Sequence, residues 1–229
     1  MTRAASRSAA DLPADGDESL TARAYRIIER SLIVGGLRPG DVLSEPALMA
    51  ATGCGRTPVR EAIQRLARAH LLTIVPYHGA FVAPVDPRTQ MKVLEMRREL
   101  DPVVAAAACR RVDAAARRRL HGLAARLRRG LADGDNLVVV EVDGEFKRLL
   151  LRLCGNPHLA RTMEPVYAVA RRFYFSTVVE PDLEVGRRHI AHIERVAGGD
   201  PAAAAAAASD FVAAIDALTR AAMMTSALR

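Results

Sequence analysis

The stretch GCGRTPVREA, residues 53–62, decides the fold because it contains the end of one helix and the start of the next. Glycine readily takes the left-handed conformation of a tight turn between helices, so Gly53 is expected to end a short helix over residues 45–52. Thr57 is a good N-cap, and Pro58 then occupies the first helical position, where its missing N–H costs no hydrogen bond. The stretch therefore predicts a helix-turn-helix.

The helix that follows the turn has two different faces. Val59, Ile63 and Leu66 recur at helical spacing and are expected to face a core. Arg60 and Gln64 are four residues apart, so they share another face of the same helix. We therefore expect this helix to pack on its own domain through one side and to present polar groups on the other.

The residues around this pair of helices complete a small domain. Apolar residues at helical spacing predict a first helix that begins at Ser19 and stops near Gly35 and Gly36. Beyond the second helix, residues 73–83 are rich in β-branched and aromatic side chains and predict a hairpin with its turn at Gly79. Helix, helix, turn, helix and hairpin is the order of a winged helix-turn-helix, which we assign to residues 19–84.

Two further regions flank this domain. Residues 1–18 are polar, with four acidic side chains, and predict a disordered tail. Residues 84–87 contain two prolines and predict a linker. Residues 85–229 are expected to form an all-helical bundle, with Pro102 kinking its first helix; its helices are predicted at 88–110, 113–132, 136–154, 156–178, 182–198 and 201–228. The predicted fold class is mostly α, a winged helix-turn-helix (three helices plus a β-hairpin) followed by a helical bundle.

Composition limits the function without deciding it. The net charge is +7, and residues 87–229 carry +6 against +3 in residues 19–86, so charge alone does not single out the winged domain. Cys54, Cys109 and Cys154 form no zinc-binding or disulfide pattern and suggest reduced thiols in a cytoplasm. We find no apolar run of membrane-spanning length and no signal-peptide core, so we expect a soluble cytoplasmic protein with no membrane partner.

The N-terminal residues, taken in order, closely resemble the DNA-binding domain of GntR-type regulators. The matching segments are Leu37–Gly40, Glu45, residues 53–62, Arg65–Leu66, Leu71 and residues 76–82. The C-terminal part resembles FCD, the all-helical ligand domain of the FadR branch, through residues 95–101, 143–146 and 155–157 and through His189, eleven residues before Asp200. The chain is too short for an aminotransferase-like fusion, and it lacks the strands of the α/β ligand-domain branch.

The resemblance implies binding to double-stranded operator DNA through the start of the second helix of the turn and through the wing. Arginine can pair with O6 and N7 of guanine, and helix starts suit phosphate. The implied DNA-binding residues are Arg56, Thr57, Pro58, Arg60, Gln64, His78 and Gly79. Two positions depart from the family pattern: His70 stands where glycine is usual, and His78 where arginine is common.

Many relatives hold a divalent metal in the helical domain, using an Asp, a His four residues later and two further His. Asp143 and His189 match two of these positions, but Lys147 and Phe211 occupy the other two. A protonated lysine cannot coordinate a metal and a phenyl ring has no ligating atom, so we expect no metal cofactor. Asp143, His189 and His192 remain as residual metal candidates, although we interpret His192 as a surface or interface histidine.

Lys147 suggests a replacement for the metal. Its ammonium is expected either to stand in for the cation and pair with Asp143, four residues away, or to bind an anionic effector directly. Arg97 matches the arginine that such pockets use toward carboxylates. The expected effector-binding residues are Arg97, Asp143, Lys147, His189 and Phe211. The alternative is that Asp143 and Lys147 form an ordinary exposed ion pair.

These features predict a homodimeric transcription factor, usually a repressor, whose operator affinity is changed by a small carboxylate effector. Two other functional classes stay open. One is a metal-dependent enzyme, such as a hydrolase using Asp143, His189 and His192, although no nucleophile elbow, phosphate loop or complete zinc motif supports it. The other is an architectural DNA-binding protein without an effector, against which the large helical domain argues.

Overall fold

The computed structural model describes residues 19–178 and 180–227, with side chains through Met224. The chain forms two compact units, unit 1 up to Pro84 and unit 2 from Val85 onward. The division falls inside the predicted linker. The predicted disordered tail, residues 1–18, lies outside the described residues.

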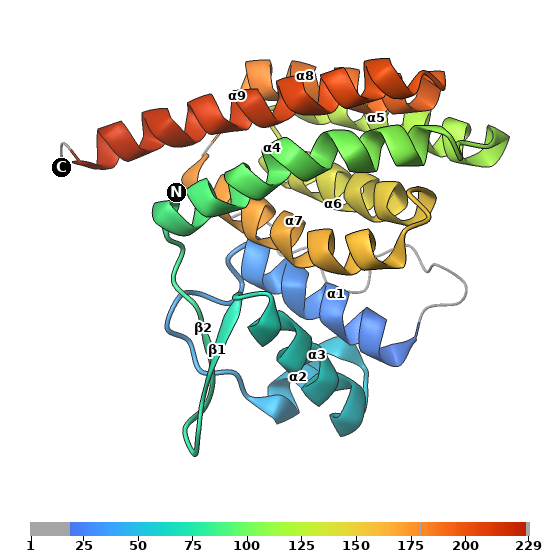
Figure 1. Cartoon of the computed structure of the whole chain (residues 1–229). Helices are drawn as coiled ribbons and strands as arrows, with labels where there is room; N and C mark the ends of the chain where they lie inside the picture. The colour runs from blue at the N-terminus through green and yellow to red at the C-terminus, as the bar shows by residue number, and fades with distance from the viewer. Residues whose placement is uncertain (1–18, 179, 228–229) are drawn as a thin grey trace. The chain divides into compact units, whose positions relative to one another are not determined.

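Unit 1 has the element order that the sequence predicts, which confirms the winged helix-turn-helix (Figure 1). The first helix, α1, packs against both α2 and α3, and α3 packs against β1. The elements of unit 1 are α1 (Leu20–Ile33), α2 (Glu45–Thr52), α3 (Arg56–Arg68), β1 (Leu72–Val75) and β2 (Gly79–Val82).

The turn between α2 and α3 follows the prediction at its first residue and differs at its last. Gly53 caps α2 in the left-handed conformation, with φ of 65°. The predicted N-cap of α3 is wrong, because Gly55 caps the helix and helical residues begin at Arg56. The extended backbone of Gly55 already offers its carbonyl to the Val59 amide at 3.3 Å, two residues before the predicted N-cap. Pro58 is therefore the third helical residue.

The core face of α3 is the predicted one. Val59, Ile63 and Leu66 are all buried, and Ala62 lies between them. Full burial of one such aliphatic side chain stabilises a domain by about 1.5–3 kcal/mol, so this face holds α3 firmly on unit 1. The opposite face is left to solvent.

The hairpin of β1 and β2 is held on both sides of β2. Leu72 pairs with Val82, and Val75 pairs with Gly79. On its other edge β2 binds residues 41–43, since the Leu43 amide donates to Ala80 at 2.8 Å and the Val82 amide donates to Asp41 at 2.9 Å. The predicted turn position is off by a residue or more, because Gly79 already belongs to β2 and residues 76–78 make the turn.

Unit 2 is helical in all its regular elements within the described residues. The helices are α4 (Pro87–Cys109), α5 (Ala114–Ala132), α6 (Asn136–Leu153), α7 (Pro157–Thr177), α8 (Leu183–Gly198) and α9 (Pro201–Ala227). In Figure 1, α9 runs antiparallel along α4, and both pack on α8. The linker is shorter than predicted, because Asp86 caps α4 and Pro87 is already helical. Helix α4 continues across Pro102, and the predicted kink there stays a prediction.

The expectation that no stretch reaches membrane-spanning length needs correction. Residues Pro201–Met224 of α9 are long and apolar enough by composition, with a mean hydropathy of 1.4. Much of this apolarity comes from the alanine run, and one face of the helix is buried in unit 2 through Ala204, Ala208 and Val212. A core helix of a helical bundle has this composition too, so the stretch is weak evidence for a membrane.

Candidate DNA interface and effector cavity

The N-terminal turn of α3 presents two arginines to solvent. The side chains of Arg56 and Arg60 are 69% and 62% exposed. Glu45, the first residue of α2, holds them: its carboxylate lies 2.8 Å from Nε of Arg60 and 3.9 Å from Nε of Arg56. Glu45 thus binds Arg60 through Nε.

The first turn of α3 also exposes backbone donors. No side chain caps the N-terminus of this helix. The first amides of a helix have no partner inside it, and the helix dipole adds partial positive charge at that end. This end of α3 is therefore suited to an anionic oxygen such as a DNA phosphate.

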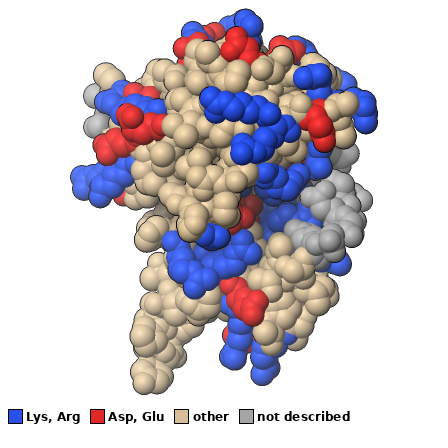
Figure 2. All heavy atoms as spheres, turned by 45° about the vertical axis from the view of Figure 1, so that its right-hand side comes forward, with Lys and Arg blue, Asp and Glu red and all other residues tan. Residues whose placement is uncertain are grey.

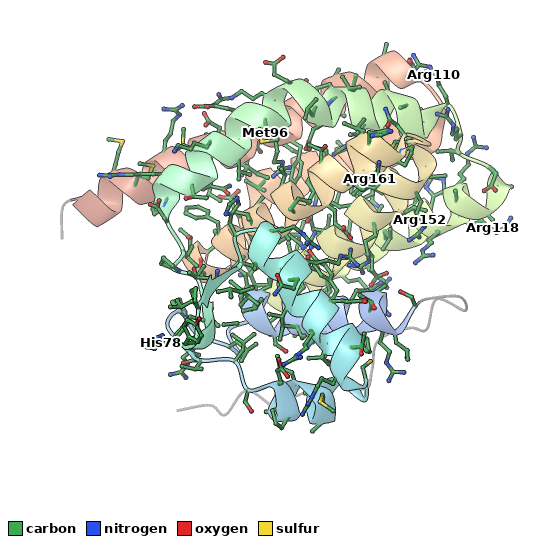
Figure 3. All side chains as sticks on the ribbon, turned by 60° about the horizontal axis from the view of Figure 1, so that its bottom comes forward. His78, Met96, Arg110, Arg118, Arg152 and Arg161 are labelled. Atoms are coloured by element: carbon green, nitrogen blue, oxygen red, sulfur yellow. The ribbon has the colours of Figure 1, made fainter. Side chains whose placement is uncertain are left out.

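The remaining predicted contact residues also lie on the surface of unit 1. Thr57 and Gln64 are exposed on α3, and Pro58 is half-buried beside them. His78 and Gly79 are exposed at the end of the hairpin, where Figure 3 labels His78. The structure thus places all of these residues where a ligand of unit 1 can reach them.

His70, at a position where the resemblance implies glycine, has a strained backbone. Its φ is 57°, in the left-handed region where a Cβ atom is crowded. The residue follows Ala69, the C-cap of α3, and its amide donates to the Ala67 carbonyl at 2.9 Å. The fold requires this conformation, and a histidine adopts it at a cost in stability.

Unit 2 contains a cavity of about 40 Å³ between its helices. The volume equals a few water molecules, far less than a typical drug-sized pocket. Apolar residues supply most of the wall, together with a small set of polar and charged groups. The lining residues are Arg97, Val139, Val140, Asp143, Lys147, Tyr167, Ala170, Arg171, Tyr174, Val185, Gly186, His189, Phe211 and Ile215.

Lys147 is buried, but its partner is not the predicted one. Its ammonium lies 3.4 Å from Asp101 on α4, so the expected pair with Asp143 is replaced by one across two helices. The same carboxylate oxygen accepts two hydrogen bonds from Arg97, at 3.0 and 3.2 Å. The lysine ammonium also lies 4.5 Å from the centre of the Tyr167 ring. The alternative of an ordinary exposed pair is therefore wrong.

Burial and pairing compete within this cluster. Burial raises the pKa of Asp101, but Arg97 and Lys147 outweigh it and hold that pKa below its usual value. Burial lowers the pKa of Lys147, and Asp101 offsets only part of that effect. The expected role of Arg97 as a free carboxylate receptor is changed, because its guanidinium is already paired with Asp101.

Asp143 faces a different cation. Its carboxylate lies 3.8 Å from a guanidinium nitrogen of Arg171 on α7. Its other oxygen lies 3.4 Å from Nε2 of His189, in a geometry that makes no hydrogen bond.

Two neutral histidines line or support the cavity. Burial lowers the pKa of His189 to about 4, and burial lowers the pKa of His192 well below its usual value. The ring of His189 stacks on Phe211 at 4.4 Å, and the ring of His192 meets Phe146 edge-on at 4.9 Å. The interpretation of His192 as a surface or interface histidine is wrong, because it is fully buried.

The residues present do not fit the metal of the related domains. Phe211 covers one face of His189, and the lysine ammonium lies in the same buried cluster as Arg97. Arg171 is already beside Asp143, so a divalent cation bound to that carboxylate would face a nearby guanidinium. Among the residues the structure describes, no three His, Cys, Asp or Glu side chains are grouped to hold a metal ion.

Sequence reasoning missed Asp101 and Arg171 as parts of this site. Asp101 is the last residue of the segment 95–101 that matches the family. The only sign of its role was that it lies four residues after Arg97, on the same face of a helix. Arg171 is one of 31 arginines and has no distinguishing spacing. Only the packing of α6 against α7 brings it beside Asp143.

Much of the positive charge of unit 2 lies at one end of the bundle, where α4 and α6 finish and α5 and α7 begin. Figure 3 labels Arg110, Arg118, Arg152 and Arg161 there. Other arginines at this end bind carbonyls that a helix terminus leaves unpaired; Arg117, for example, donates to Ala197 at 2.9 Å. This end of the bundle accounts for part of the charge that lies outside the winged domain.

A winged helix-turn-helix with exposed arginines at its second helix, joined to a helical domain with a charged internal cavity, defines a DNA-binding regulator with a sensor domain. The family models agree with this class. Residues 20–82 match the gntR family of bacterial regulatory proteins, and residues 92–214, more than half of the chain, match the FCD domain. The chain belongs to the GntR family of transcriptional regulators with an FCD domain.

The relatives are regulators as well, not enzymes. The HTH-type transcriptional regulator McbR of Escherichia coli is 26% identical over 149 residues, which cover 65% of this chain and 67% of McbR. An uncharacterized HTH-type regulator of Streptomyces ambofaciens is 41% identical over 63 residues, 28% of this chain and 27% of its own.

Solved structures agree with the fold. The E. coli McbR structure has a TM-score of 0.73 at 21% identity and covers 89% of this chain and 98% of its own. A GntR regulator structure from Rhodococcus sp. RHA1 has a TM-score of 0.63 at 24% identity, covering 89% and 97%.

Proposed function

We propose that this protein is a homodimeric cytoplasmic repressor that binds operator DNA through α3 and the β1–β2 wing. In this proposal, a small carboxylate binds in the cavity of unit 2 and changes operator affinity. By linkage, an effector that prefers one pose of the two DNA-binding units shifts affinity for DNA, and DNA shifts affinity for the effector equally.

The observation that carries the DNA part is the exposed, carboxylate-held pair Arg56 and Arg60 at an uncapped helix start. With Nε of Arg60 held by Glu45, the guanidinium plane is fixed before DNA arrives, which reduces the ordering cost of a bidentate contact to guanine. The amides of the first turn would bind a phosphate and set the depth of α3 in the major groove.

The proposed homodimer follows from the small number of base pairs that one DNA-binding unit can contact. One recognition helix contacts only a few base pairs, and helix-turn-helix proteins gain specificity by binding two half-sites with two-fold symmetry. We therefore propose a palindromic operator whose half-sites are spaced by about one helical turn of DNA.

The carboxylate part rests on the charge around the cavity. Three cationic side chains, Arg97, Lys147 and Arg171, meet two carboxylates, those of Asp101 and Asp143, while burial keeps the nearby histidines neutral. In this proposal the carboxylate of the effector binds beside these cationic side chains. The cavity is small, so such an effector would have to displace lining side chains. That displacement would change the packing of the helices around the cavity.

We propose that the protein senses without a resident metal. The lysine ammonium supplies fixed positive charge in the buried cluster, where it is paired with Asp101. Elemental analysis of purified protein tests this directly. One equivalent of a tightly bound divalent metal per chain would contradict it.

The test of the DNA part compares two arginines of the same helix. The operator is first recovered by letting the wild-type protein select from a pool of random duplexes. We expect Arg60→Ala to weaken binding to that operator about 5- to 150-fold, from the loss of a bidentate contact worth about 1–3 kcal/mol. Arg68→Ala, in the last turn of α3, is the control and should bind like wild type. Unchanged affinity in folded Arg60→Ala protein would remove this residue from the interface.

The test of the effector part is a thermal-shift screen against small carboxylic and sugar acids. A ligand of the folded state raises Tm in a saturable way. A hit should also change operator affinity in a gel shift, and Arg171→Met should lose the response. Loss of the response in folded Arg171→Met protein would assign the effector to this cavity. If no acid stabilises the protein, the carboxylate proposal fails while the DNA proposal stands.

A further inference from the structure

The wing of unit 1 ends in a strained turn. The His78 amide donates to the Val75 carbonyl at 3.0 Å, with Pro76 and Tyr77 between them. Proline at the second position and a positive φ at the third are the pattern of a type II turn, and Tyr77 has φ of 64°. That third position suits glycine or asparagine, so an aromatic residue there costs stability.

Nothing within the described part of the chain repays this cost. The side chain of Tyr77 is 105% exposed, and its neighbours on the strand, Ile74 and Val75, are also among the exposed large apolar residues. Strain of this kind at an exposed position points to a contact made outside the chain.

The wing is also uncharged. Residues 71–83 contain no Asp, Glu, Lys or Arg, and Figure 2 shows the projecting hairpin at lower left without blue or red atoms. The start of α3, in contrast, carries Arg56 and Arg60 close to Glu45. The two parts of unit 1 therefore offer different chemistry to a ligand.

We propose that Tyr77 is a DNA-contacting residue, and that the wing binds by apolar contact of this ring with the sugar edges of the minor groove. The inference rests on the proposed binding of operator DNA. The tip of the hairpin and the start of α3 lie at the same end of unit 1 in Figure 1, so one duplex can meet both. Apolar side chains contact the minor groove without releasing counterions, whereas arginine contacts to phosphate do release them.

The first experiment separates folding from binding at one position. In Tyr77→Gly the strained turn is relieved, so Tm should rise, yet affinity for the selected operator should fall about tenfold with loss of the aromatic contact. Tyr77→Phe should bind like wild type. The slope of log affinity against log salt should stay unchanged in Tyr77→Gly and become shallower in Arg60→Ala.

A second experiment uses the absence of tryptophan from the sequence. Tyr77→Trp places a single tryptophan at the wing tip, and its fluorescence should change on addition of operator in proportion to binding. Hydroxyl-radical footprints should show minor-groove sugars protected by wild type and by Tyr77→Phe, and exposed with Tyr77→Gly. His70→Gly is the control. Among the described residues, His70 is the other non-glycine residue with a positive φ, so this variant should raise Tm without loss of affinity.

The outcomes separate the two proposals. If wild-type protein selects no sequence, the proposed function itself fails. If wild type binds but Tyr77→Gly binds equally well, or changes the salt slope, the inference is overturned while operator binding stands. If Tyr77→Gly instead changes the sedimentation coefficient of the free protein, the ring contacts another copy of the chain, and the inference is also overturned.

Discussion

The two units place the same kind of side chain in opposite surroundings. On α3, Arg56 and Arg60 are more than three-fifths exposed, whereas Arg97 and Lys147 in unit 2 have side chains only 3% and 2% exposed. Exposed ion pairs contribute little to stability, whereas a buried charge that loses its partner is costly. The exposed cations are thus available to a partner at little cost to the fold, while the buried cations are part of the fold.

The largest expected effect is therefore on stability in unit 2. Lys147→Met removes one of two cations beside the buried Asp101 carboxylate and should cost about 3 kcal/mol of unfolding free energy. Arg98→Met, which removes a partly exposed partner of Asp216 at 2.7 Å, should cost below about 1 kcal/mol. Urea denaturation measures both.

A third variant keeps this prediction interpretable. If the cost of Lys147→Met arises from Asp101, the double variant Asp101→Asn with Lys147→Met should be less destabilised than the two single effects added together. Equal costs for Lys147→Met and Arg98→Met would mean that burial makes no difference between these two cations.

A second contrast concerns pH. The folded-state pKa of His189 is about 4, below the usual value near 6.5, because burial disfavours the charged ring. Between pH 6.5 and pH 4, this histidine is protonated in the unfolded chain and neutral in the folded chain. The free energy of unfolding is therefore highest above pH 6.5 and falls as the pH is lowered toward 4. We expect a loss of about 2 kcal/mol from this residue between pH 7 and pH 5.

Two substitutions test this pH effect. His189→Phe should reduce the loss, because a phenyl ring can keep the stacking on Phe211 without titrating. His121→Phe, at an exposed position of α5, should leave the loss unchanged. Denaturation at pH 7 and pH 5 gives the comparison, and an identical pH response in wild type and His189→Phe would contradict it.

The smallest effect is in unit 1. His70→Gly releases a left-handed backbone strain worth about 1 kcal/mol and should raise the stability of this unit by that order, without affecting unit 2. Differential scanning calorimetry of the whole chain follows the transition to which unit 1 contributes. A fall in Tm would mean that the histidine side chain makes a contribution larger than the strain.

The sequence by itself determined the elements and their order. Gly53 required a turn after α2, and the apolar spacing of Val59, Ile63 and Leu66 required a buried face on α3, because both are local consequences of backbone geometry. Helix ends were predicted less well: Gly55 rather than Thr57 is the N-cap of α3, and no side chain caps this end.

Only the tertiary structure decided which charges meet. Lys147 and Asp143 share a helix and were expected to pair, but packing of α6 against α4 brings Lys147 to Asp101, 46 positions earlier. Packing of α6 against α7 places Asp143 beside Arg171, and His192 is buried in the core. Sequence spacing reports which side chains share a face of one helix, but burial and pairing depend on what the neighbouring helices bring to that face. For this reason the buried face of α3 was largely predictable, and the pairing of charges around the cavity of unit 2 was not.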